Sequence, residues 1–147
     1  MSIEIFNGTM QKFGAPDTVI HQFQHWSLLL RPAQLTLGAL VLVAHEPVQS
    51  FSALSSASFA ELQIVTGKID FALKKAFQYD KLNYLMLMMV DPDVHFHVIP
   101  RYAQIREFVG KSFRDAGWPG VPDFSEVNET DSNTNQQIIK YLISCWE

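Results

Sequence analysis

The chain has 147 residues, with 11 basic and 15 acidic side chains and a formal net charge of −4. Because 48% of the residues are hydrophobic and only 18% are charged, a wholly disordered chain is excluded. The mild negative charge argues against binding to duplex DNA or to an anionic membrane, since both favour a basic surface. The single cysteine, Cys145, excludes an intramolecular disulfide.

The length and the apolar runs also bear on domain number and compartment. No stretch has the roughly 18 consecutive apolar residues of a membrane-spanning helix, and the start of the chain lacks the apolar core of a signal peptide. We therefore expect a cytoplasmic protein. We also expect one domain over residues 1–147, with a core at about 13–102 and a C-terminal extension at about 103–147.

Three apolar runs in the first third of the chain each predict a strand. Residues 18–23 are rich in β-branched and aromatic side chains. Residues 26–30 stop before an Arg-Pro pair, and proline favours extended geometry in the residue that precedes it. Residues 39–44 lie between a glycine and a Glu-Pro pair and are too few to indicate a helix, so they favour a buried strand.

The following segment changes to the period of a helix. Apolar residues recur every three or four positions, which places them on one face of a helix over about residues 58–78. Ser58 and Glu61 match a capping box, in which each side chain hydrogen-bonds to the backbone N–H of the other. The apolar positions are Phe59, Leu62, Val65, Ile69, Leu73, Ala76 and Phe77.

Two more strands are predicted at 83–90 and 94–99. Asp-Pro-Asp at 91–93 is short enough for a hairpin turn, so the two strands should pair antiparallel. After an irregular Gly/Pro-rich stretch at 117–122, an amphipathic pattern predicts a final helix. Consecutive strands with one main helix favour an α+β fold with an antiparallel sheet and exclude a doubly wound parallel fold. The apolar residues of the final helix are Ile138, Ile139, Leu142 and Trp146.

Asp93, His95 and His97 alternate with apolar residues in the last of these strands. Side chains two positions apart in a strand lie on the same face, about 6.6 Å apart along the chain. We therefore expect the three polar side chains to project together, while the apolar residues between them face the core. Since three polar groups cannot be packed in an apolar interior without partners, their face should meet a cleft or water.

The run from Asp93 to Arg101 resembles the signature of the histidine triad (HIT) superfamily. In that signature three histidines alternate with apolar residues, and Pro-Arg often follows, as it does here at 100–101. The resemblance extends to the apolar runs before and after Gly38 and to the helix that starts near Ser58. It covers about residues 13–102 and implies a five-stranded antiparallel sheet with one main helix, followed here by a C-terminal helical extension.

The resemblance also implies a function. Members are nucleotide hydrolases or nucleotidyl transferases that attack an α-phosphate, of the dinucleoside polyphosphate or nucleoside phosphoramidate type, with the middle histidine. It implies that His95 is the nucleophile, held by a backbone carbonyl at its second ring nitrogen, and that His97 stabilises charge on the phosphoryl group. Asp93 would be an orienting carboxylate and Arg101 a phosphate contact. The route needs no cofactor, and family members often form a homodimer with a sheet continuous across both subunits.

The sequence departs from the family pattern at three places. Asp93 stands where the first histidine is expected, and a carboxylate there could repel an incoming phosphate. The segment 90–93 is too short for the loop of phosphate donors that many members have. Ala39 stands where a further histidine would follow Gly38. The candidates for binding the nucleotide are Arg31, Gln34 and Arg101, of which the last alone matches the motif.

Two other functions remain open from the residues alone. A non-catalytic nucleotide-binding module would keep the cleft and lose turnover. A metal-dependent hydrolase could use the His-x-His pair as ligands, with Asp93 adding an oxygen. The histidines that could fold nearby to complete such a site are His21, His25 and His45, although we expect them to be surface or strand residues.

Several remaining residues favour a structural role. A cluster of methionines predicts packing in the core of the hairpin rather than a copper site. Trp118 and Phe124 are expected to fix a loop, with stacking on a nucleobase as the alternative. Cys145 is expected to pack against its neighbours. The clustered methionines are Met86, Met88 and Met89.

Overall fold

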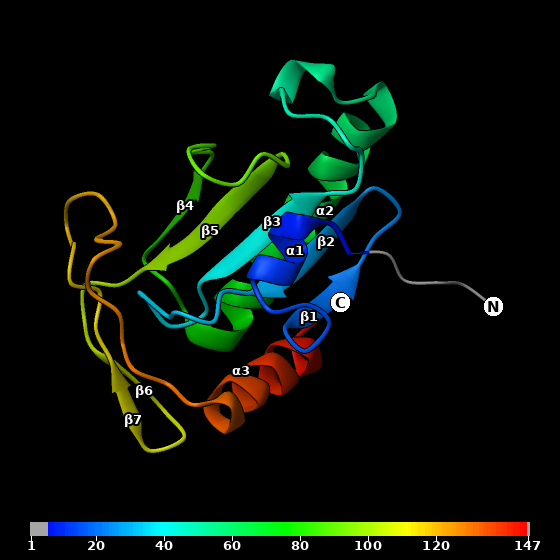
Figure 1. Cartoon of the computed structure of the whole chain (residues 1–147). Helices are drawn as coiled ribbons and strands as arrows, with labels where there is room; N and C mark the ends of the chain where they lie inside the picture. The colour runs from blue at the N-terminus through cyan, green and yellow to red at the C-terminus, as the bar shows by residue number, and fades with distance from the viewer. Residues whose placement is uncertain (1–5, 147) are drawn as a thin grey trace.

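The computed structural model describes residues 6–146, and its centre is a five-stranded antiparallel sheet (Figure 1). The strands lie in the order β1-β2-β3-β5-β4, so β1 and β4 form the two edges. The predicted α+β class with an antiparallel sheet is therefore confirmed. The strands are β1 (Val19–Gln22), β2 (Trp26–Leu30), β3 (Leu40–Ala44), β4 (Lys81–Leu85) and β5 (His95–Arg101).

Helices cover both faces of the sheet. The 22-residue helix α2 (Ser56–Phe77) and the C-terminal helix α3 (Ser132–Ser144) pack on one face and enclose the larger core. The short helix α1 (Gly8–Lys12) lies on the other face, in front of the sheet in Figure 1, where Met10 packs with Leu29 and Val41. Because both faces are covered, every residue of β2 and β3 is buried, which explains why their sequences read as continuous apolar runs.

The main helix is confirmed, but its predicted capping box is wrong. The helix begins two residues earlier, at Ser56, and the side chain of Ser55 accepts the hydrogen bond from the backbone N–H of Ser58. Glu61 turns instead to the connection between β1 and β2, where its carboxylate accepts from the backbone N–H groups of Gln24 and His25. A carboxylate in the first turns of the helix thus fixes a distant turn and not its own cap.

The hairpin that carries the histidines differs from the prediction in its connection. The two strands do pair antiparallel, but β4 ends at Leu85, opposite His97, and not at Val90. Met88 has a φ of 52°, which is incompatible with a continued strand. Residues 86–94 therefore form a longer loop, and the expectation of a three-residue turn is wrong.

The structure contains short elements that the sequence analysis did not predict. A small hairpin of β6 (Arg106–Phe108) and β7 (Lys111–Phe113) projects from the sheet, and a 3-10 turn (Phe51–Ala53) precedes α2. The predicted final helix is confirmed and starts earlier than its apolar pattern suggested, because Asp131 caps it by accepting from Thr134 N. Within residues 6–146, no helix combines the length and apolar character needed to cross a membrane.

Candidate functional site

The strand β5, between β3 and the edge strand β4, holds His95 and His97 on the face of the sheet that α1 covers. Their ring centroids lie 5.2 Å apart with the planes at 80°, so the two imidazoles are direct neighbours. Phe13, just after α1, packs against both rings, at 6.4 Å from His95 and 5.9 Å from His97. The expected projection of the two histidines to one side is therefore observed.

A cavity of about 220 Å³ opens beside the two histidines. Besides the two histidines of β5, four segments build its walls: Lys12 and Phe13 at the end of α1, Arg31 after β2, residues 87–91 of the loop before β5, and Phe124. We call this cavity the histidine pocket. Its walls are apolar except for the two cations, the two imidazoles and Asp91, so polar groups converge on a small, mostly apolar space.

His95 is held in one tautomer by a backbone carbonyl. Its Nδ1 lies 2.6 Å from the carbonyl oxygen of Asp93. Because a carbonyl oxygen can only accept, Nδ1 must donate, and the neutral ring then keeps its lone pair on Nε2. His95 is only 2% exposed, so the available nitrogen belongs to a ring whose orientation is fixed by its surroundings.

His97 is a neutral imidazole with spare hydrogen-bonding capacity. Burial, reinforced by the neighbouring His95 and Arg31, lowers the pKa of His97 to about 4. Its Nδ1 is buried and has no hydrogen-bond partner among residues 6–146. A buried polar atom without a partner is costly, so His97 keeps unused hydrogen-bonding capacity next to the cavity.

Arg31 supplies a cation to the same pocket. Its guanidinium lies over the ring of Phe124 at 5.4 Å, and Nη1 donates to the carbonyl of Ala33 at 2.8 Å. Nε is buried and has no partner within the described part of the chain. Burial lowers the pKa of Arg31, but an arginine stays charged at neutral pH. The arrangement favours an anion, since an anion would take up the free N–H group.

The carboxylate of Asp93 does not follow the expected geometry. Asp93 lies in a bend before β5 and outside the strand, so it does not share the alternation of the two histidines. Its Oδ2 accepts hydrogen bonds from the hydroxyl and the backbone N–H of Thr9, at 2.8 and 3.3 Å. The expected projection of Asp93 beside the two histidines is therefore wrong: its backbone carbonyl contacts His95, while its carboxylate bonds to Thr9.

Gln34 is placed as a structural residue. It is fully buried, and its amide donates to the carbonyls of Arg31 and Ala39 while it accepts from Gly38 N. These bonds use both ends of the amide to hold the connection between β2 and β3. The expectation that Gln34 binds a nucleotide is corrected, and its role is to brace the segment that begins with Arg31.

Arg101 also forms its hydrogen bonds outside the histidine pocket. It is 4% exposed, and its Nε and Nη2 donate to the carboxylate of Asp115 at 2.7 and 3.1 Å. Nη1 donates to the side chain of Asn83 at 2.9 Å. A guanidinium with these partners has little capacity left for a phosphate, so the phosphate contact expected from the Pro-Arg motif is corrected to a buried ion pair.

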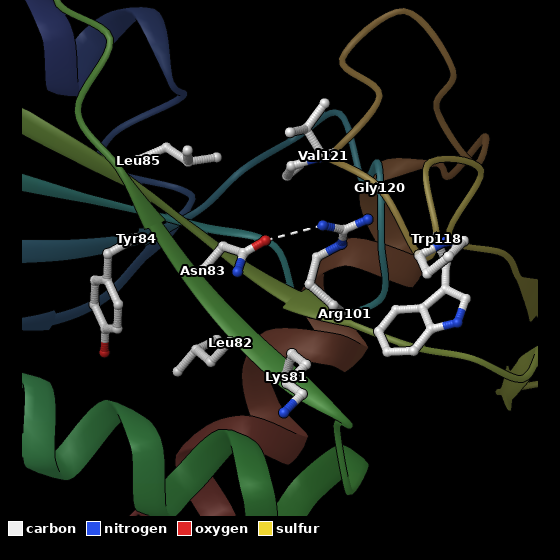
Figure 2. A pocket seen from close by; sticks show the side chains of 11 residues that line it. Lys81, Leu82, Asn83, Tyr84, Leu85, Arg101, Trp118, Gly120 and Val121 are labelled. Atoms are coloured by element: carbon white, nitrogen blue, oxygen red, sulfur yellow. Dashed lines mark hydrogen bonds between the residues drawn. The ribbon is translucent and has the colours of Figure 1, made fainter.

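Arg101 lies in a second hollow, an open groove of about 800 Å³ along the edge strand β4. Figure 2 shows its guanidinium between β4 and the segment that carries Trp118 and Gly120, with a dashed line to Asn83. We call this hollow the β4 groove. Trp118 thus lines the groove, whereas Phe124 lies in the histidine pocket, where its ring is 5.4 Å from that of His97.

The other histidines lie outside the lining of the pocket. His21 packs with Phe23 and Trp146, and His45 bonds to Ser27 and to the carbonyl of Gln24. Within residues 6–146, no group of three or more His, Cys, Asp or Glu side chains could hold a metal ion.

The sequence analysis did not identify Lys12 and Phe13 as pocket residues, nor Asp115 as the partner of Arg101. Lys12 and Phe13 come from a five-residue helix too short to give a periodic signal, and only the pair of an aromatic with a cation before a Gly-Ala-Pro turn hinted at them. Asp115 has no motif at all. Met89 is 85% exposed, so the predicted packing of the methionine cluster is wrong for that residue, while Met86 and Met88 pack against the core. Cys145 is buried as expected.

Comparison with solved structures identifies the fold. A histidine triad protein from Sinorhizobium meliloti matches with a TM-score of 0.76 and 20% identity, over 96% of either chain. A histidine triad protein from Bradyrhizobium japonicum matches with a TM-score of 0.74 and 20% identity, over 97% of this chain and 98% of that one. The diadenosine triphosphate hydrolase of Plasmodium falciparum, solved with Cyclomarin A, matches with a TM-score of 0.63 and 10% identity, over 88% and 76%.

The chain therefore has the histidine triad fold, as its motif indicated. No protein-family model and no curated protein matches its sequence. The agreement thus lies in the backbone.

Proposed function

We propose that the chain is a nucleotide hydrolase or nucleotidyl transferase that acts at an α-phosphate through His95. The observation that carries the proposal is the pair of neighbouring imidazoles in the pocket, one with its Nδ1 bonded to a carbonyl and the other without a partner on its Nδ1. The fold shared with a diadenosine triphosphate hydrolase supports the same class of reaction.

In the first step, Nε2 of His95 attacks the α-phosphorus of the substrate. A nitrogen–phosphorus bond forms, and the bond from phosphorus to the leaving group breaks, with its electron pair going to the leaving group. The Nδ1 hydrogen bond to the carbonyl of Asp93 stabilises the positive charge that develops on the imidazole. The second step is the attack of water, or of another acceptor, on the nucleotidyl-histidine, which releases the nucleotide and restores the free imidazole.

The charged residues of the pocket suit the phosphate in this reaction. Arg31 has a free N–H group on a partly buried guanidinium, and Lys12 lies in the same wall, 2.9 Å from Asp91. Neutral His97 can donate one hydrogen bond to a phosphoryl oxygen. Arg31, Lys12 and His97 would thus bind the phosphate, in place of Arg101 and Gln34.

Turnover of diadenosine polyphosphates and of adenosine phosphoramidate tests the proposal. We expect His95→Ala to lower kcat on the order of 1000-fold or more, because the nucleophile is lost. His21→Ala, which changes a histidine packed on Trp146 outside the pocket, is the matched control and should keep full activity. Unchanged turnover in His95→Ala would refute the assignment.

A nucleotide-binding module without turnover is the second candidate, and one feature favours it. The loop before β5 presents Leu87, Met88, Met89 and Val90 to the pocket, and Asp91 adds a negative charge there. These side chains offer no donors to a leaving phosphate. Calorimetry with AMP that gives stoichiometric binding, together with no hydrolysis of either substrate, would establish this candidate in place of the enzyme.

We also propose that two copies associate through β4. This strand is an edge of the sheet and lines an open groove, so one side of its backbone is free to pair. Antiparallel pairing about a two-fold axis at Asn83 sets Lys81 of one copy opposite Leu85 of the other, which avoids like charges. Such an isologous contact would extend the sheet across both copies.

Hydrogen exchange provides the test, with the other edge of the same sheet as an internal control. We expect amides of β4 to become protected as the concentration rises from nanomolar to micromolar, while those of β1 do not change. Sedimentation should show twice the chain mass. A single 16.7 kDa species at micromolar concentration would refute the dimer.

A further inference from the structure

The contact between Thr9 and Asp93 joins α1 to the bend that precedes the histidine strand. Thr9 is 1% exposed, and 84 residues of chain separate it from Asp93. Both hydrogen bonds that it donates reach the same oxygen, Oδ2. A buried hydroxyl and a backbone N–H that converge on one carboxylate oxygen fix the position of that residue closely.

The same residue bonds to the histidine through its backbone. The carbonyl oxygen of Asp93 accepts from Nδ1 of His95 at 2.6 Å. Asp93 lies in a bend and outside β5, so the hydrogen bonds of the sheet do not determine where its carbonyl points. Another restraint has to do so, and the carboxylate bonded to Thr9 provides it.

Further contacts close a ring around this bend. The side chain of Asn7, which caps α1, donates to the carbonyl of Ala44 at 3.1 Å. The backbone N–H of Ala44 donates in turn to the carbonyl of Val94 at 2.9 Å. Since Val94 follows Asp93, the ring returns to Thr9 through α1, and the N-terminal end of α1 is thereby fixed relative to the histidine strand.

We propose that Thr9 and Asp93 are a positioning pair for His95, in which the carboxylate anchored by α1 aims its own backbone carbonyl at Nδ1. The pair would keep the Nε2 lone pair of His95 directed into the pocket. It also gives the aspartate a role that does not require contact with phosphate, because the negative charge is turned toward α1. The consequence for catalysis rests on the function proposed above, whereas the consequence for the imidazole does not.

The test removes the hydroxyl of Thr9 and keeps the size of its side chain. Thr9→Val removes one of the two hydrogen bonds to Asp93, and Thr9→Ser restores it. Thr36→Val is the matched control, because Thr36 is equally buried and its hydroxyl has no partner within the described residues. If Thr9→Val fails to fold, Asp93→Ala removes the other end of the same bond, and Asp93→Asn keeps an oxygen that can accept it.

Nitrogen-15 NMR of the imidazoles is the first readout, since it does not depend on turnover. We expect the wild-type His95 to show one tautomer with a slowly exchanging Nδ1 proton. In Thr9→Val that proton should exchange on the order of tenfold faster, and the second tautomer should appear. Thr9→Ser and Thr36→Val should resemble the wild type. An unchanged His95 signal in folded Thr9→Val, or in folded Asp93→Ala, would overturn the proposal.

Kinetics is the second readout and separates this proposal from the function. We expect Thr9→Val to lower kcat on the order of tenfold with little change in KM. The variant changes the orientation of the His95 ring and does not change the groups that bind the substrate. An altered His95 tautomer without turnover in any variant would refute the enzyme and support the positioning pair. Normal turnover with an unaltered signal in Thr9→Val would refute the pair and support the enzyme.

Discussion

The histidine pocket and the β4 groove differ in size and in whether their buried polar side chains have hydrogen-bond partners, and the second difference is the more informative. Both contain an arginine beside an aromatic residue from the C-terminal third of the chain. The groove is larger, at about 800 Å³ against 220 Å³. However, the side-chain hydrogen bonds that its Arg101 donates all go to Asp115 and Asn83. The smaller pocket holds Arg31 and His97, each with a buried nitrogen that lacks a partner among the described residues. Unused hydrogen-bonding capacity, and not volume, is therefore what marks the smaller hollow as the candidate ligand site.

The largest expected effect is on the stability of the groove. Asp115→Ala leaves the buried Arg101 without its carboxylate, and removing one partner of a buried ion pair costs about 3–5 kcal/mol of unfolding free energy. Urea denaturation measures the change. Nucleotide affinity, measured where the variant is folded, should stay within about twofold of the wild type. A stable variant that had lost nucleotide binding would reverse our assignment of the two hollows.

The next effect is on ligand binding in the pocket. Arg31→Met removes a charged donor, so we expect calorimetry to show AMP binding weakened about 10-fold to 100-fold. The unfolding free energy should change by less than about 1 kcal/mol, since the buried Nε loses no partner and the hydrogen bond lost from Nη1 to the carbonyl of Ala33 is exposed. Arg114→Met, at an exposed arginine outside both the pocket and the groove, is the control. An equal loss in both variants would indicate only a general effect of charge.

A smaller effect is the change of stability with pH that His97 in the pocket causes. The pKa of His97 is about 4 in the folded chain, below its ordinary value near 6.5, because the ring is buried. As the pH falls from 7 to 4, the unfolded chain takes up a proton that the folded chain does not, so stability falls by at most about 1.4 kcal/mol per pH unit. Urea denaturation of His97→Gln should show a shallower slope. Identical slopes in both proteins would mean that His97 titrates normally.

The smallest effect is at the rim of the pocket. Lys12 and Asp91 form an exposed pair, in which half of the lysine side chain is accessible. Asp91→Asn should therefore change stability by less than about 1 kcal/mol, and by less at high salt. It removes a negative charge from a site for anions, so AMP should bind about twofold to fivefold more tightly. Weaker binding would show that Asp91 takes part in holding the ligand.

Much of the fold was predictable because local patterns and burial agree. The three runs before α2 follow from their apolar content, and the helix follows from the period of its apolar residues. The antiparallel pairing of β4 with β5 follows from the short connection between them. The prediction failed where a polar residue had two possible partners. Glu61 matched a local cap but bonds to the backbone of Gln24 and His25, and no pattern within α2 distinguishes the two outcomes.

The site was predictable only along one strand. Alternation places His95 and His97 side by side because both lie within β5. Asp93 precedes the strand, so the alternation does not extend to it, and its partner Thr9 lies 84 residues away. Arg101 matched a motif but pairs with Asp115, which the sequence did not mark. Contacts between distant segments are set by the assembled fold, and a single sequence carries no local signal for them.

The walls of the histidine pocket come from five stretches of chain between residues 12 and 124, the histidine strand included. The pocket therefore exists only after α1, the sheet and the C-terminal third have come together, and an unfolded chain offers no equivalent surface. A nucleotide that binds there adds its binding energy to the stability of the whole chain through mass action. The thermal midpoint should accordingly rise with ligand concentration, which makes a simple melting screen a practical route to the preferred base.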